Sequence, residues 1–256
     1  MALKNYSYLG KGPIYAGVRG KGRFPVGNCS ALNFAVSESK ISQPDYTSPG
    51  GGEANAVSRV DAVTGSMTLL DISPKNLSLA YRGTEREVTG GVSATDERHT
   101  AYPGALIALD ETPDISAAET SITVTLDPDG TPVVLTYNVD YEVTRAGIVF
   151  LEGGANVTDA VDGHEVGVDY DKADSVVMEA LVASGKEYNL VFDGLNEADS
   201  GKAVIITAHR ITFSPTQGTS FIGDEFAELP LEFSVLSDNT IVGANISKFF
   251  KVSMEQ

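Results

Sequence analysis

The chain has 256 residues, of which 42% are apolar and 21% charged, a balance typical of an ordinary folded protein rather than a disordered one. Its formal net charge of −17 argues against a surface that wraps nucleic acid, because phosphate binding depends on lysine and arginine. A single cysteine excludes an internal disulfide bond. No run approaches the roughly 18 apolar residues of a membrane helix, and no secretory signal is expected.

The N-terminal segment, residues 1–23, has five basic residues, five glycines and no acid, and the first acid of the chain is Glu38. This composition predicts a flexible basic arm on an acidic body. Exposed ion pairs contribute only about 0–1 kcal/mol each, so apolar residues are expected to supply most of the energy with which the arm binds. These apolar residues are Tyr6, Tyr8, Leu9, Ile14 and Tyr15.

Most of the remaining segments alternate apolar and polar residues with a period of two and end at glycine, proline, asparagine or aspartate. This pattern is typical of antiparallel strands joined by short turns, so the chain is predicted to be mainly β. Strands predicted at 24–36 and 57–72 are expected to form a long hairpin. The polar residues 37–55 between them include Pro44, Pro49 and three consecutive glycines, and are predicted to form a long loop that reaches outward to a partner.

One helix is predicted in "SPKNLSLAYRG", where Ser73 is the N-cap, Pro74 the first helical residue and Gly83 the stop signal. Its apolar face is expected to lie on a sheet. The segment "VVMEALVASG", residues 176–185, is compatible with a short helix or with a strand.

The pair Gly201–Lys202 invites comparison with a phosphate-binding loop, but Asn196 stands where the first glycine is required and Ala203 where the hydroxyl is required. The Asp-Gly pairs in "DPDG" and "DAVDGHE" are interpreted as turns. Three separated histidines and the lone Cys29 form no metal or nucleophile motif. The sequence therefore predicts a protein that is not an enzyme and that needs no cofactor and no metal.

Three stretches resemble the major tail tube proteins of long-tailed, non-contractile bacteriophages. They are "DISPKNLSLAYRG", "VDYEVTRAGIVFLEGGANVTDAVDGHEVGVDYDKA" and "YNLVFDGLNEADSGKAVIITAHRITFSP", the last followed by "LPLEFSVLSD" and "SKFFKV". Together they span most of the chain. The resemblance implies a single tail tube domain over residues 1–256, built from two packed antiparallel β-sheets in a sandwich or barrel-like arrangement with one flanking α-helix.

The same resemblance implies hexameric rings that stack into a hollow tube in the virion tail, assembled in the host cytoplasm. The partners would be other copies of the chain, other tail proteins at the tube ends, and DNA that passes through an acidic lumen without specific binding. By position, residues 37–55 would contact the next ring. The expected contact residues of this loop are Ser39, Gln43, Asp45, Tyr46, Gly50 and Glu53.

In such an assembly the N-terminal arm is expected to dock on the acidic body of a neighbouring subunit. Its contact residues would be Lys4, Lys11, Ile14, Tyr15, Arg19, Lys21 and Arg23. The strand at 57–72 is expected to line the channel with short side chains on one face, which suit a sliding polyanion. These candidate lumen-facing residues are Ser58, Thr64, Ser66 and Thr68.

Two alternatives remain open. Residues 115–173 are rich in their own hairpins, which points to a subdomain inserted into a smaller tube core, on the outside of the tube. An Ig-like or adhesin-type surface recognition module shares the many short strands and turns, although the helix, the long glycine-rich loop and the basic N-terminus fit it less well.

Overall fold

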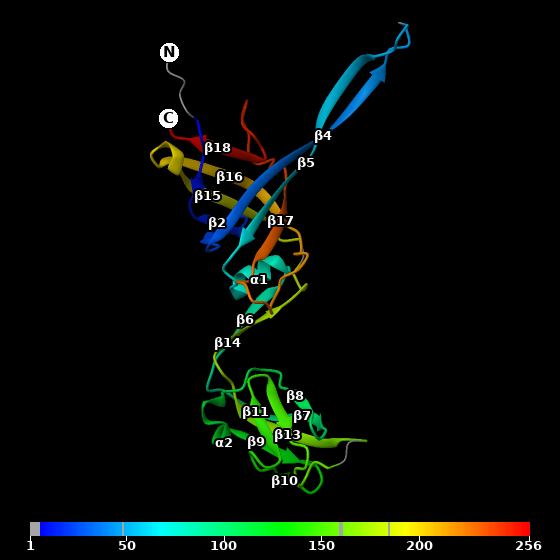
Figure 1. Ribbon diagram of the computed structural model, residues 1–256, viewed down its shortest axis with the longest axis vertical. Helices are drawn as coiled ribbons and strands as arrows, with labels where there is room; N and C mark the ends of the chain where they lie inside the picture. Colours follow the sequence, from blue (N-terminus) through cyan, green and yellow to red (C-terminus); the bar gives the residue numbers. More distant parts are fainter. Residues whose placement is uncertain (1–5, 48, 159–160, 184) are drawn as a thin grey trace. The chain divides into compact units, whose positions relative to one another are not determined.

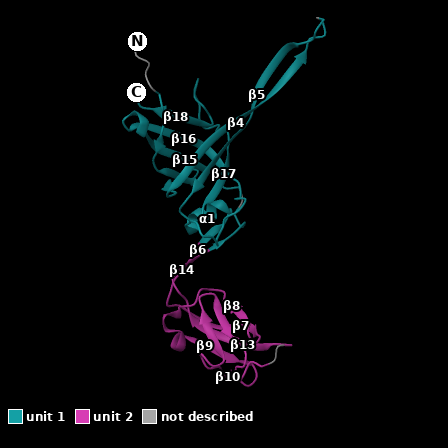
Figure 2. Ribbon diagram, viewed as in Figure 1, with its two compact units in different colours: residues 1–85, 178–256 teal, residues 86–177 magenta. Residues whose placement is uncertain are grey.

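The computed structural model describes residues 6–47, 49–158, 161–183 and 185–256. The protein is mainly β, with several antiparallel sheets, which confirms the predicted fold class. The chain forms two compact units, shown in different colours in Figure 2. Unit 1 comprises residues 1–85 and 178–256, and unit 2 comprises residues 86–177.

Unit 1 contains one nine-stranded sheet with the order β3-β2-β15-β16-β17-β5-β4 (Figure 1). Two further strands attach at its sides, because β1 pairs with β15 and β18 pairs with β16. The bounds are β1 Gly10–Lys11, β2 Ile14–Val18, β3 Phe24–Pro25, β4 Cys29–Pro44, β5 Glu53–Leu69, β15 Tyr188–Asn196, β16 Lys202–Phe213, β17 Leu229–Val235 and β18 Phe250–Met254.

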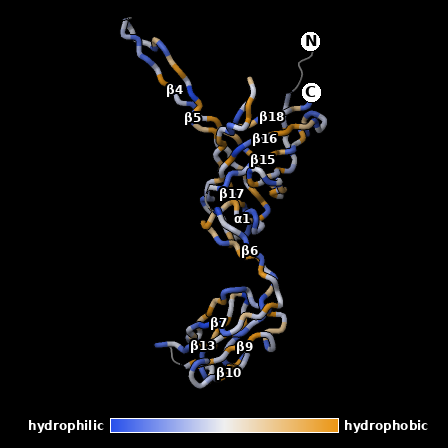
Figure 3. Tube along the Cα trace, turned by 180° about the vertical axis from the view of Figure 1, so that it is seen from behind, coloured by the Kyte–Doolittle hydropathy of each residue, from blue (hydrophilic) through white to orange (hydrophobic). Residues whose placement is uncertain are grey.

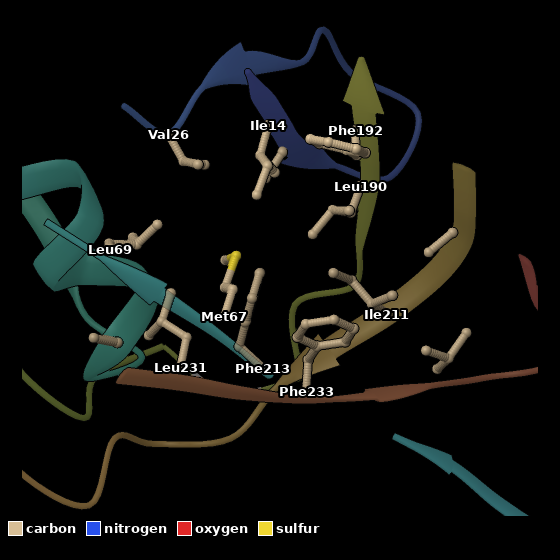
Figure 4. Packing of buried hydrophobic residues seen from close by; sticks show 14 of the residues in the cluster. Ile14, Val26, Met67, Leu69, Leu190, Phe192, Ile211, Phe213, Leu231 and Phe233 are labelled. Carbon is tan, nitrogen blue, oxygen red and sulfur yellow. The ribbon is translucent and has the colours of Figure 1, made fainter. Parts of the chain in front are cut away.

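The core of unit 1 lies between opposite parts of this curved sheet. In Figure 4, Ile14 and Phe192 enter the core from one side, and Leu231 and Phe233 enter it from the other. Strand β5 supplies a buried residue at every second position near its end, as a strand with one buried face must. Gly65 is one of them: a Cβ atom there would lie 2.3 Å from the Phe233 ring, so only glycine lets this ring pack against the strand.

The predicted helix is confirmed as α1, Pro74–Ala80. The Ser73 hydroxyl accepts a hydrogen bond from the Asn76 amide at 3.2 Å, which caps the first turn. The buried Asn76 side chain donates to the carbonyl oxygens of Val26 and Asp71, at 2.8 and 2.7 Å, and so fixes the helix to the segment after β3 and to the segment after β5. Ala80 is fully buried in the core of unit 1, so the helix lies on the sheet as expected.

The chain passes from unit 1 to unit 2 and back through two strands, β6 (Thr84–Val88) and β14 (Ser175–Glu179), which pair with each other. The segment 176–185, which the sequence left open between helix and strand, therefore begins as a strand.

Unit 2 has a four-stranded sheet of order β10-β9-β13-β7 and a three-stranded sheet of order β11-β12-β8. It begins well before the hairpin-rich region 115–173, because two strands nearer the N-terminus pair with strands inside that region. The bounds are β7 Ser93–Ala101, β8 Leu106–Ala108, η1 Ile115–Ala117, α2 Ala118–Ser121, β9 Ile122–Leu126, β10 Val133–Val134, β11 Tyr141–Thr144, β12 Gly147–Phe150 and β13 His164–Asp171.

The predicted hairpin is present as β4 and β5, but the prediction of a long loop at 37–55 is wrong. The strands remain paired as far as Pro44 and Glu53, so only residues 45–52 form the connection. Residues 38–44 and 53–60 are exposed on both faces of the ribbon, so nothing imposes an alternation of apolar and polar residues. Figure 3 shows hydrophilic and hydrophobic residues mixed along this part of the hairpin.

Candidate assembly surfaces

The N-terminal segment is not a free arm from residue 10 onward, which corrects the prediction that it docks on a neighbouring subunit. Strand β2 pairs with β15 of the same chain, where Tyr15 lies opposite Val191, and Ile14 is 2% exposed in the core of unit 1. The glycines that suggested flexibility serve close packing instead. A Cβ atom at Gly12 would lie 2.2 Å from the carbonyl oxygen of Asp193.

Two of the basic side chains of this segment pair with the body of their own chain. Arg19 donates to Asp238 at 2.7 Å and lies 3.6 Å from Glu187, and Arg23 donates to Asn189 at 2.9 Å. Hydrogen bonds from Thr240 and the Arg19 guanidinium lower the pKa of Asp238 to about 2. The remaining bases Lys11 and Lys21 are exposed, and Lys4 lies outside the described residues.

Asn196, at the end of β15, holds the segment that precedes β1. Its side-chain oxygen accepts hydrogen bonds from the amides of Leu9 and Ala198, at 2.9 and 3.2 Å, and its side-chain nitrogen donates to the carbonyl oxygen of Ser7 at 3.0 Å. Asn196 is 6% exposed. Sequence reasoning considered this residue only as a misfit in a phosphate loop; the usable signal was an asparagine at the end of a strand, where its side chain satisfies turn amides.

The distal half of the hairpin consists of residues 38–44 and 53–60 and the connection between them. It contains all six residues expected in the inter-ring loop. Ser39, Gln43 and Glu53 lie in the paired strands, and Glu53 forms an ion pair with Lys40. The other three, Asp45, Tyr46 and Gly50, lie in the connection at the tip, where the Tyr46 side chain is 89% exposed.

A face rich in hydroxyl groups covers the outer side of the sheet at the root of the hairpin. Thr64, Ser66 and Thr68 alternate with the buried residues of β5, and cross-strand pairing places Asn33 of β4 and Ser234 of β17 beside them. We call these five residues the hydroxyl face.

A shallow groove of about 360 Å³ runs over the hydroxyl face, and Glu232 supplies its charge. Among the described residues that line this groove, none is basic.

Ser58 does not belong to this face, so the prediction of one continuous lumen-facing row is wrong at that position. Ser37 pairs with Ala62, but the next residue, Glu38, pairs with Val60, which leaves Asp61 as an extra residue in β5. This β-bulge reverses the alternation beyond it and turns Ser58 to the other side of the ribbon.

A further apolar surface was missed by sequence reasoning. The connection between β16 and β17, residues 214–228, exposes 70% of Phe221, 93% of Ile222 and 99% of Phe226. Phe221 and Ile222 are adjacent, and one glycine and two acids separate them from Phe226, so the three residues give no alternating strand pattern. The available signal was the occurrence of two phenylalanines in a segment that is otherwise typical of a turn.

Unit 2 contains a network of polar side chains around Glu97. This carboxylate accepts hydrogen bonds from the Tyr170 hydroxyl at 2.7 Å and the Asp110 amide at 2.8 Å, and lies 2.7 Å from Nε2 of His99. Burial raises the pKa of Glu97, but these hydrogen bonds outweigh burial and leave it below its ordinary value. Burial and the bond to Glu97 raise the pKa of Tyr170. The network joins β7 to β13 and stabilises unit 2.

The segment around Gly201–Lys202 has the geometry of a turn. A short 3-10 helix, η2 (Glu197–Asp199), follows β15, then Ser200 and Gly201 adopt positive φ angles of 54° and 75°, and β16 begins at Lys202. Lys202 forms an ion pair with Asp199 at 3.1 Å.

Within the part of the chain that the structure describes, no cluster of three histidine, cysteine or acidic side chains is placed to hold a metal ion. Over those same residues, no helix combines the length and the apolar character needed to cross a membrane.

Comparison with known proteins gives one informative result. None of the curated proteins compared with the chain matches it. A family model described as "Protein of unknown function UCP028589" matches residues 7–253, which include most of the N-terminal segment, the hairpin, nearly all of unit 1 and all of unit 2. Since this match covers nearly the whole sequence, the chain belongs to that family.

Proposed function

We propose that the protein is a structural subunit of a phage tail tube, in which hexameric rings stack into a hollow tube that delivers the genome to the host. The observation that carries this proposal is the distal half of the β4–β5 hairpin, which is exposed on both faces over residues 38–44 and 53–60. It agrees with the resemblance of three sequence stretches to major tail tube proteins.

An isolated two-stranded ribbon is at best marginally stable in water, so a ribbon of this length is expected to gain a partner. Val57 and Val60 of this ribbon are 49% and 52% exposed, and its backbone edges are open to further strands. In a tube built from identical subunits, this partner is a second copy of the chain. The hairpin is the part of the molecule suited to reach the next ring.

The hydroxyl face suits the lining of a channel for DNA. Its side chains are short and polar, and its groove contains the acidic Glu232 and no basic residue among the described residues that line it. If the groove contained lysine or arginine, these residues would bind the DNA phosphates. An acidic surface rich in hydroxyl groups instead lets a polyanion slide. The proposed lumen contact is therefore non-specific and weak.

The function proposed is architectural, with no turnover, no metal and no cofactor. Two of the aspartates in the segments "DPDG" and "DAVDGHE" have partners within the chain. Asp129 pairs with Arg98 at 2.9 Å, and the Asp127 carboxylate accepts the amide of Thr131 at 3.0 Å within a turn. Asp162 is exposed, and Asp159 lies outside the described residues. Chelation of divalent metal is expected to leave assembly unchanged, and dissolution of the tubes would contradict the turn interpretation.

The alternative is an adhesin-type recognition module. Unit 2 favours it, because a compact unit of two antiparallel sheets inserted through two paired strands is a self-contained binding scaffold. A recognition module would appear as discrete particles, whereas a tail tube subunit would form rings or filaments.

Electron microscopy and sedimentation of the purified protein test the proposal. The decisive variant replaces residues 40–58 with Asn-Gly, which joins the paired residues Ser39 and Arg59 through a two-residue turn. We expect the wild type to form rings or tubes. The variant should sediment as a monomer and be folded by circular dichroism. A wild type that stays monomeric at all concentrations, or a shortened variant that still forms long tubes, would contradict the proposal.

The lumen assignment has its own test. Thr64→Lys with Ser66→Lys adds two cations to the hydroxyl face, and Val134→Lys, on exposed β10 in unit 2, is the control. Tubes of the double variant should retain DNA in a salt-dependent manner, whereas wild-type and control tubes should not. Equal retention by all three would remove the hydroxyl face from the lumen.

A further inference from the structure

The connection between β16 and β17 exposes its three apolar side chains, and its start is fixed by hydrogen bonds. At its start, the Ser214 amide donates to the carbonyl oxygen of Glu232 at 2.8 Å, and the Thr216 amide donates to Ala80 of the helix at 2.8 Å. The Thr216 hydroxyl also donates to the carbonyl oxygen of Pro230 at 2.8 Å. The segment 221–226 is therefore held out from a well-bonded root.

Unit 1 also has a groove of about 760 Å³ whose lining residues come from other segments. Ile14 and Phe192 form part of its apolar lining, together with Leu32 and Ile206. Such a volume falls in the range of pockets that enclose drug-sized ligands, so several side chains fit into it. Cys29, the single cysteine of the chain, also lines this groove.

The charges of the segment and the groove are complementary. Residues 221–228 read "FIGDEFAE", with three acids and no base. Lys11 is the charged residue of the groove, and no acid is found among the described residues that line it. In a chain with 35 acids and a net charge of −17, an acid-free groove repels this acidic segment less than most of the surface does.

We propose that the segment Phe221–Phe226 of one copy inserts into this groove on the next copy. This inference rests on the proposed function and adds to it a specific contact between subunits. The segment and the groove share no residues, so each copy can donate its segment to one neighbour and receive that of another. Such a heterologous contact generates rings or filaments, as a tube requires.

Disulfide trapping tests the contact directly, because Cys29 is the only native thiol. A thiol introduced by Ile222→Cys or by Phe226→Cys should react with Cys29 of the next copy if their Cα atoms come within about 7 Å. Burial raises the pKa of the Cys29 thiol, so oxidation should be carried out at mildly alkaline pH. We expect ladders of cross-linked copies on non-reducing gels, abolished by adding Cys29→Ser.

Val134→Cys, on exposed β10 in unit 2, measures random cross-linking. A second measurement needs no new thiol: Phe226→Ser is expected to raise the protein concentration needed for polymerisation at least about tenfold, and Val134→Ser to leave it unchanged.

The outcomes separate the contact from the tube. Tubes that form without the cross-link, at an unchanged concentration for Phe226→Ser, would overturn the contact and leave the tube. A disulfide within the monomer would overturn the contact, because the segment would then close its own groove. Cross-linked copies in a protein that forms no rings or tubes would support the contact and contradict the tube.

Discussion

Unit 1 and unit 2 each enclose an apolar core, but the chain builds them in different ways. Unit 2 is one continuous segment, residues 86–177, whereas unit 1 joins residues 1–85 to residues 178–256. In unit 1, β2 therefore pairs with β15, and β5 pairs with β17, far along the chain. Closing such long loops costs conformational entropy before any contact stabilises the fold. Unit 2 is expected to fold by itself, and unit 1 only when both of its segments are present.

The two surfaces differ as well. Phe221 and Phe226, both largely exposed, lie in unit 1, together with the long hairpin. The exposed apolar side chains of unit 2 are mainly valines, such as Val134 and Val139, which expose less apolar area than phenylalanine. Large exposed apolar groups mark interaction sites. We therefore expect association to be concentrated in unit 1, where the exposed phenylalanines and the long hairpin lie.

The largest predicted effect tests whether the two cores are independent. Phe233 is 1% exposed and packs edge-on against Phe34 and Phe213, with ring centroids 5.6 and 5.9 Å apart. Phe233→Ala is expected to destabilise unit 1 by about 3–5 kcal/mol, because it leaves a cavity in a closely packed core. Phe150→Ala is the matched change in unit 2, where Phe150 is fully buried.

Hydrogen exchange followed by mass spectrometry distinguishes the units, because each peptide reports on its own region. Phe233→Ala should accelerate exchange in residues 178–256 and leave residues 86–177 protected, and Phe150→Ala should do the reverse. If either change exposes both regions equally, the two units unfold as one and the comparison fails.

A smaller effect is predicted for Asn196, which fixes the segment before β1. Asn196→Ala removes the partners of the Leu9 and Ala198 amides and of the Ser7 carbonyl group. The lost hydrogen bonds are partly buried and contribute roughly 0.5–1.5 kcal/mol each, so the variant is expected to lose about 1–3 kcal/mol of stability, with protease cleavage near residue 8 as the local signature. Asn33→Ala, on the exposed hydroxyl face, should change stability little. Equal urea midpoints for the two variants would contradict the anchoring role.

The corresponding polar contact in unit 2 is the Tyr170 hydroxyl. It donates to Glu97 at 2.7 Å and accepts the Glu111 amide at 3.2 Å. Tyr170→Phe keeps the ring, which is 1% exposed, and is expected to destabilise unit 2 by about 1 kcal/mol. Assembly should be unchanged, since the proposed association surfaces all lie in unit 1. A variant that folds normally but forms no tubes would move part of the assembly function into unit 2.

Local signals in the sequence were sufficient for some elements. The helix was predictable because Ser73, Pro74 and Gly83 act within a few residues of the turns that they cap or end. The paired strands β4 and β5 were predictable near the core, where one face is buried. The tip was not, because a ribbon exposed on both faces has no hydrophobic period.

Other features depend on contacts distant in sequence. The glycines of residues 10–22 suggested flexibility, and the approach of the Asp193 backbone to Gly12 is invisible in composition. The bulge at Asp61, which moves Ser58 to the other side, is a property of pairing rather than of either strand. For the candidate site, the hydroxyl face was largely predictable from the alternation of residues in β5. The groove over this face was not, because its lining comes from segments that only the fold brings together.

The smallest effect predicted is a pH dependence in the contacts of the N-terminal segment. Asp238 is 5% exposed, and hydrogen bonds from Thr240 and Arg19 lower its pKa to about 2. A carboxyl group with a depressed folded-state pKa stabilises the fold above its unfolded-state pKa, near 3.9, and loses this contribution as the pH falls through about 2. The urea midpoints of wild type and Asp238→Asn should therefore differ at neutral pH and converge between about pH 4 and about pH 2. Arg19→Gln should follow the same profile, because it removes the other partner of the ion pair, and a difference that stays constant over this range would show that the carboxylate charge at 238 does not stabilise unit 1.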